Sequence, residues 1–136
     1  MILHLCDTVR LSRVTSVLTA LDADVNPSKL LLYTEPMPDP GDAITTQTLI
    51  ATIILADPAG TIDDEAMELT FGAVTPVLAT HDGDLAWGRF TDGDNNWVMD
   101  GDAGETGDDK FIIIDNKTIY AGGMVTVTLG TLTEPV

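Results

Sequence analysis

The chain has 136 residues, 44% of them hydrophobic, and its 22 acidic side chains outnumber six lysines and arginines to give a net charge of −16. A chain of this length forms one domain, residues 1–136, and buries roughly two-thirds of the surface that its unfolded form exposes. Nucleic-acid binding depends on lysine and arginine that neutralise phosphates, so the charge argues against a nucleic-acid partner and against an anionic membrane surface.

The N-terminal sequence and the cysteine content bear on the compartment. The first seven residues lack the basic region of a secretory signal, and no apolar run approaches the roughly 20 residues of a membrane span. Cys6 is the single cysteine, which excludes an internal disulfide, and we expect a buried, inert thiol there. These features predict synthesis in a cytoplasm.

One helix is predicted, at about residues 7–22. Asp7 is placed to cap it, and Asn26-Pro27 ends it because a residue before proline avoids the α conformation. A helix with one apolar face needs a partner, either a sheet or a neighbouring subunit. The apolar face is formed by residues at helical spacing: Leu11, Val14, Leu18 and Leu21.

Two strands and a stiff loop follow the helix. Residues 29–34 read as a strand, and residues 35–41 hold three prolines, which predicts an extended loop without a regular ladder. Residues 49–56 are apolar on both faces apart from Thr52, a pattern that suits a central strand covered on both sides.

The rest of the chain predicts further short strands, and about eight strands in all favour an antiparallel β-sandwich or jelly roll with one N-terminal α-helix. In the last of them Leu132 has the opposite parity to Val125, Val127 and Leu129, which predicts a bulge at Gly130 that returns Leu132 to the core. These later strands are expected at residues 67–71, 85–91, 96–100, 110–114 and 124–133.

Asp92, Asp94 and Asn96 form the densest group of oxygen ligands and match the first three spacings of a calcium loop. Trp97 replaces the glycine that an EF-hand requires, so a hairpin turn is the favoured interpretation, with a calcium site as the alternative. If Thr91 pairs with Trp97, a regular ladder places Arg89 opposite Met99.

Arg89 lies between two aromatic residues of a predicted strand. Its side chain is either an anchor for an acidic partner or, as is more common, stacks on an aromatic ring or pairs with an aspartate of the same fold. The aromatic residues Trp87, Trp97, Tyr33 and Tyr120 could form a sugar-binding platform, although core packing is the simpler interpretation.

Catalysis has little support in the sequence. His4 and His81 lie far apart and have no metal-ligand spacing, and no nucleophile elbow, phosphate-binding loop or dinucleotide fingerprint is present. We therefore expect a protein that is not an enzyme and needs no cofactor.

Several segments together resemble the small virion proteins encoded among the head and tail genes of tailed bacteriophages. The resemblance covers most of the chain and is carried by structural motifs: the N-terminal helix, the Leu-Leu-Leu-Tyr-Thr strand with its Pro-x-Pro loop, residues 49–58, residues 86–90, the Asp-Gly-rich hairpin, residues 113–123 and the Val-Thr-Val-Thr ending. The match departs at Trp87-Gly88-Arg89, where an aromatic residue directly before the arginine is expected.

The resemblance implies a capsid decoration, or cement, protein on the capsid exterior of the virion that binds and stabilises the major capsid protein lattice, with self-association as a dimer or trimer. The alternatives are a minor tail or baseplate component, and a calcium- or carbohydrate-binding module for host attachment. Candidate partner contacts lie on the helix, the proline loop and one strand: Arg10, Arg13, Pro36, Met37, Pro38 and Arg89.

Overall fold

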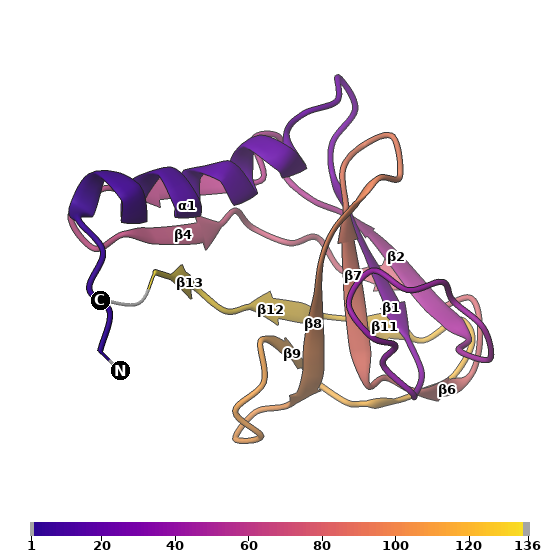
Figure 1. Cartoon of the computed structure of the whole chain (residues 1–136). Coiled ribbons are helices and arrows are strands. Elements are labelled where there is room, and N and C mark those ends of the chain that lie inside the picture. Colours follow the sequence, from indigo (N-terminus) through magenta and orange to yellow (C-terminus); the bar gives the residue numbers. More distant parts are fainter. Residues whose placement is uncertain (1, 135–136) are drawn as a thin grey trace.

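The computed structural model describes residues 2–134 and is mainly β with one helix, α1 (Asp7–Leu21) (Figure 1). The described strands are more numerous and shorter than the sequence predicts. They are β1 (Lys29–Tyr33), β2 (Leu49–Ile54), β3 (Gly60–Asp63), β4 (Glu68–Phe71), β5 (Val77–Leu78), β6 (Gly83–Asp84), β7 (Trp87–Thr91), β8 (Trp97–Glu105), β9 (Ile112–Ile114), β10 (Thr118–Ile119), β11 (Met124–Val125), β12 (Val127–Leu129) and β13 (Leu132–Thr133).

Six strands form one curled sheet, a half-barrel, in the order β12-β9-β8-β7-β1-β2. All neighbours in it are antiparallel except β8 and β9, which run parallel and pair Ala103 with Ile112. Residues 106–111 make this connection with a short loop in place of a helical crossover, and Gly107 and Asp109 adopt positive φ values of 96° and 55°. The prediction of a wholly antiparallel fold was wrong here, and a sandwich or jelly roll is not confirmed.

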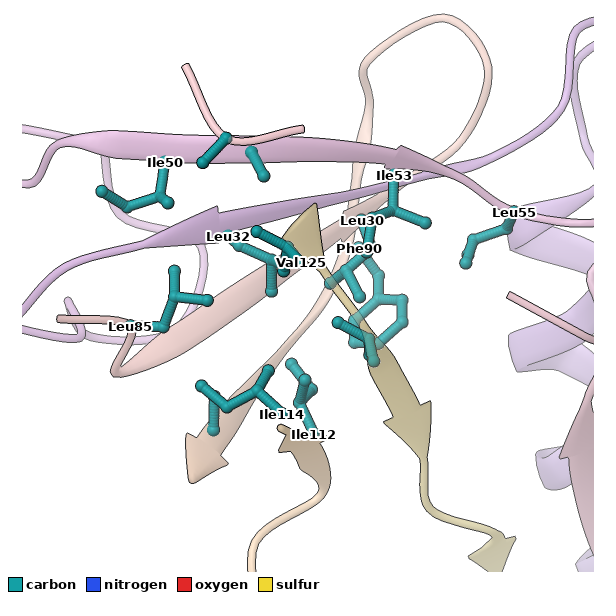
Figure 2. Packing of buried hydrophobic residues seen from close by; sticks show 14 of the residues in the cluster. Leu30, Leu32, Ile50, Ile53, Leu55, Leu85, Phe90, Ile112, Ile114 and Val125 are labelled. Carbon is teal, nitrogen blue, oxygen red and sulfur yellow. The ribbon is translucent and has the colours of Figure 1, made fainter. Parts of the chain in front are cut away.

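Short ladders extend the curl of this sheet beyond β2. The Thr80 amide donates to the Ile50 carbonyl at 2.8 Å, and β5 pairs with β11, which precedes β12 directly in the chain. These bonds connect the two ends of the six-stranded sheet around a shared interior. Figure 2 shows that interior, where β1 contributes Leu30 and Leu32 and β9 contributes Ile112 and Ile114.

A second sheet, in the order β13-β4-β3, lies beside the half-barrel and under α1 (Figure 1). Val14 and Leu21 are the buried residues of the helix. Three phenylalanines join this sheet to the half-barrel, because Phe71 of β4 lies 5.6 Å from Phe90 of β7 and 6.1 Å from Phe111, measured between ring centroids. Such aromatic contacts hold the two sheets together as one hydrophobic unit.

The helix spans the predicted residues, but three local expectations were wrong. Cys6, not Asp7, occupies the N-cap position, makes no side-chain cap and is exposed. Strand β2 is the last strand of the six-stranded sheet, and Ile54 is 50% exposed, so apolar composition on both faces did not mean burial on both faces.

The predicted bulge at Gly130 was also wrong. The chain leaves one sheet and enters another at this point: β12 pairs with β9, whereas β13 pairs with β4 through Leu132 and Leu69. The Gly130 amide donates to the Phe111 carbonyl at 2.8 Å. A change of sheet therefore explains the change in parity.

We expect Val14→Ala to lower the free energy of unfolding by about 2 kcal/mol, because it leaves a cavity where α1 meets the second sheet. Val14 is fully buried, whereas Val25 is 90% exposed, so Val25→Ala is the matched control and should change stability by less than about 0.5 kcal/mol. Urea unfolding measures both, and equal effects would contradict this placement of the helix.

Candidate functional site

Strand β7 is buried along its whole length, and this burial organises the most distinctive cluster of side chains. Strand residues alternate between faces, so Phe90 lies on the face that points into the half-barrel and Trp87 and Arg89 lie on the opposite face. The outer face is covered by residues 34–48, the β1–β2 loop, which passes in front of β1 and β7 in Figure 1.

The 34–48 loop is held by bonds at its base and within it. The Thr34 amide donates to the Thr48 carbonyl at 3.1 Å, and the Gln47 side-chain amide donates to the Pro36 carbonyl at 2.5 Å. Gly41 has a φ of +76°, and a Cβ there would lie 3.4 Å from the Trp97 ring. The loop therefore packs directly over the start of β8.

Trp87 and Tyr33 stack beneath this loop at 4.9 Å between ring centroids, and the Trp87 indole N–H donates to the Thr34 carbonyl at 2.9 Å. Burial raises the pKa of the Tyr33 hydroxyl. Trp87 is fully buried, whereas Tyr120 is 70% exposed. The four aromatic residues therefore form no common sugar-binding platform. Trp87 and Tyr33 pack inside the fold.

Arg89 is engaged inside the fold. Its guanidinium stacks over Trp87 at 5.4 Å, and its Nε and Nη2 atoms donate to the two Asp100 carboxylate oxygens at 2.8 and 3.1 Å. The Trp97 indole N–H also donates to Asp100, at 3.1 Å. The hydrogen bond to Asp100 is the main cause that raises the pKa of Arg89. The arginine charge is thus neutralised by an aspartate of the same sheet, in agreement with the interpretation of an internal pair.

The predicted pairing of Arg89 with Met99 was wrong by one residue. Thr91 pairs with Trp97 as expected, but the register shifts between Phe90 and Thr91. Phe90 therefore pairs with Met99, and Arg89 pairs with Asp100. The irregularity beside the turn is what brings the arginine and the aspartate together across the two strands.

The three residues of the possible calcium site lie on one turn, between β7 and β8. The Asp92 carboxylate accepts hydrogen bonds from the Asp94 amide, the Asn96 amide and the Asn96 side chain at 2.9 to 3.0 Å. The Asn96 side chain is the main cause that lowers the pKa of Asp92. A carboxylate that accepts three N–H groups closes a hairpin turn, the favoured interpretation of this segment. Among residues 2–134 no group of three His, Cys, Asp or Glu side chains is placed to hold a metal ion.

The two helix arginines contact the C-terminal part of the described chain. Arg10 lies 3.3 Å from Asp7 and donates to the Glu134 carbonyl at 3.2 Å, and Arg13 lies 3.4 Å from the Glu134 carboxylate. These contacts connect α1 to the end of β13.

Of the proline loop, Pro36 and Met37 are exposed and Pro38 is half-buried. The structure therefore separates the predicted partner contacts into three places: the helix, the loop and the covered face of β7.

Two hollows were not foreseen in the sequence, because their residues come from distant segments. An open cleft of about 700 Å³ is lined by Lys110 and Lys117 together with three acids, Glu35, Asp84 and Asp108, so its charges offset one another. A smaller and more apolar pocket of about 380 Å³ lies beside β8 and includes Met37 of the loop.

Among residues 2–134 no helix combines the length and apolar character that a membrane crossing requires.

None of the three comparisons, with protein-family models, with curated proteins and with solved structures, finds a match to this chain.

We expect Asp100→Asn to lower the free energy of unfolding by about 3 kcal/mol, because it leaves the Arg89 charge without its partner in a covered site. The two side chains are only 11% and 4% exposed. Lys110→Met is the control: its pair with Asp102 is 3.7 Å long and about half exposed, so its loss should cost less than about 1 kcal/mol. Urea unfolding distinguishes them, and similar losses would contradict a special role for the Arg89 pair.

The lowered pKa of Asp92 predicts a specific acid sensitivity. Its pKa is lower in the folded than in the unfolded chain, so its stabilising effect is present above the ordinary value near 4 and is lost as the pH falls through the folded pKa. Asp92→Asn should therefore destabilise the protein at neutral pH and progressively less toward pH 3. Asp94→Asn, on the same turn, is the control for the loss of one negative charge. Thermal unfolding between pH 3 and pH 7 measures both variants.

Proposed function

We propose that this chain is a structural protein of a tailed-bacteriophage virion, a decoration protein that binds the outside of the head and stabilises the lattice of the major capsid protein. The sequence resemblance suggests the virion setting, and the distribution of charge is the observation that carries the role. Five of the six cationic side chains have an acceptor within the chain, which leaves an excess of acids toward solvent. The five are Arg10, Arg13, Lys29, Arg89 and Lys110.

This distribution supports an exterior location. An acidic surface repels a packaged phosphate backbone, whereas it attracts a basic partner over distances of about 10 Å at moderate salt. A protein that binds the assembled lattice but not the free subunits shifts the equilibrium toward the shell by mass action. Many modest contacts repeated by symmetry then act together as one strong attachment.

The number of copies per particle tests this proposal. Quantitative mass spectrometry of purified particles should give a ratio to the major capsid protein within a few-fold of parity. A handful of copies per particle would overturn the lattice-wide role and favour the tail or baseplate, and complete absence from particles would overturn the virion proposal altogether.

Binding to preformed shells provides a second test of the same proposal. Purified protein should co-sediment with shells of the major capsid protein, raise their melting temperature and dissociate as salt is raised, because salt screens the attraction between the acidic surface and a basic partner. Binding that is equally strong at 50 mM and 500 mM salt would contradict the electrostatic basis of the proposal.

A further inference from the structure

One edge of β8 is only partly paired. Strand β7 pairs with β8 from Trp97 to Asp102, whereas β9 pairs on the other side at Ala103–Glu105 alone. Within residues 2–134 no strand pairs with residues 99–102 on the β9 side.

The backbone alternation of β8 determines which groups point to this open edge. The Ala103 amide donates to the Ala86 carbonyl at 3.0 Å, on the side of β7. Successive residues of a strand direct their N–H and C=O groups to opposite sides, so those of Asp100 and Asp102 point to the side of β9. The parallel register of Ala103 with Ile112 uses the Asp102 carbonyl, which leaves both backbone groups of Asp100 and the Asp102 N–H at the open edge. A strand edge of this kind is a template for an added strand.

An apolar pocket of about 380 Å³ opens at the same stretch of β8. It has Phe90 at its base, where the ring is fully buried, and Met37 at its rim, where the side chain is 45% exposed. An unpaired edge and an adjoining side-chain pocket are the two elements by which proteins capture extended peptides. The remaining apolar lining comes from β8, from the loop before β9 and from β13: Met99, Phe111 and Leu132.

The negative charge around this pocket determines which kind of peptide segment would bind beside β8. The proline loop places Met37 between two exposed acids, Glu35 and Asp39, and the chain as a whole carries a net charge of −16. A segment with lysine or arginine beside its apolar side chain is attracted to this surface, and an acidic one is repelled.

We propose that β8 binds an extended, basic segment of a partner protein at residues 99–102 by strand addition, with one apolar side chain of that segment in the pocket formed by Met37, Phe90, Met99, Phe111 and Leu132. Backbone hydrogen bonds to the N–H and C=O of Asp100 and to the N–H of Asp102 would fix the segment, and the pocket would select its apolar residue. Binding of such a segment does not depend on the partner being a capsid protein.

A second copy of this chain is a poorer occupant. Its residues 2–6 lie outside any helix or strand and include the exposed Ile2 and Leu3, but they contain no lysine or arginine. Association of two copies also brings together two bodies of the same strong negative charge. A dimer in which residues 99–102 are covered would therefore overturn the proposal.

The first test uses an eight-residue peptide that alternates lysine with leucine or valine, labelled with fluorescein, and the full chain. Fluorescence anisotropy should show saturable binding that weakens with salt, and a peptide with glutamate in place of lysine should bind at least about tenfold more weakly. Equal binding of the two peptides, or no binding of the lysine peptide at millimolar protein, would overturn the proposal.

Two variants with a matched design locate the pocket. Met37→Ser should weaken binding of the lysine peptide about fivefold or more, because it removes an apolar wall of the pocket. Met124→Ser alters another exposed methionine, 58% exposed, on the short β11 strand and should leave binding unchanged. Equal affinities of the two variants would place the peptide elsewhere and contradict the proposal.

Backbone pairing is tested separately from side-chain contacts. Two versions of the lysine peptide are N-methylated at alternate residues, so that each blocks one edge of the extended peptide. One version should lose binding by about tenfold or more and the other should retain it. Hydrogen exchange should show new protection at the amides of Asp100 and Asp102. Protection confined to other strands, or equal binding of both versions, would overturn strand addition.

Discussion

Cover on both faces of β7 is the constraint on which much of this structure depends. Its inner face meets the hydrophobic interior through Phe90, while its outer face carries Trp87 and Arg89, which cannot be left buried without partners. The 34–48 loop supplies the cover, and Thr34 and Asp100 supply the hydrogen-bond acceptors. A strand at the centre of the sheet thus dictates both a long loop and a polar pair beneath it.

The small number of lysines and arginines also determines how charge is distributed over the protein. Arg89 pairs with Asp100, and Arg10 and Arg13 contact Glu134 at the end of the described chain. The negative charges of the acids elsewhere are therefore mostly not neutralised by a cation. The net charge of −16 therefore comes from acids that have few cations to offset them. Specific attachment then requires an apolar or backbone element in addition to charge, because charge alone attracts any basic molecule.

Local features of this structure could be predicted from sequence and long-range ones could not. The helix at Asp7–Leu21, strand β1 and the Thr91–Trp97 turn all follow from spacing and turn chemistry within a few residues. The parallel pairing of β8 with β9 and the change of sheet at Gly130 depend on distant partners. The same distinction applies to the candidate site. The Asp92 turn is formed by neighbouring residues and could be predicted. The Arg89–Asp100 pair depends on a one-residue register shift, and the open edge of β8 depends on the shortness of β9, so neither could be predicted.

The order in which strands enter the sheets has a consequence for biosynthesis. Strand β1 pairs with β7 and β2, and each sheet acquires a strand from the last residues described: β12 joins the half-barrel and β13 joins the second sheet. A chain emerging from the ribosome can therefore pair β1 with β2 and then with β7, but neither of these two sheets is complete until nearly all of the chain has been made. Contacts so remote in sequence fold slowly, because loop closure precedes the gain from packing. Nascent chains that stop before Val127 should be poor folders that depend on chaperones.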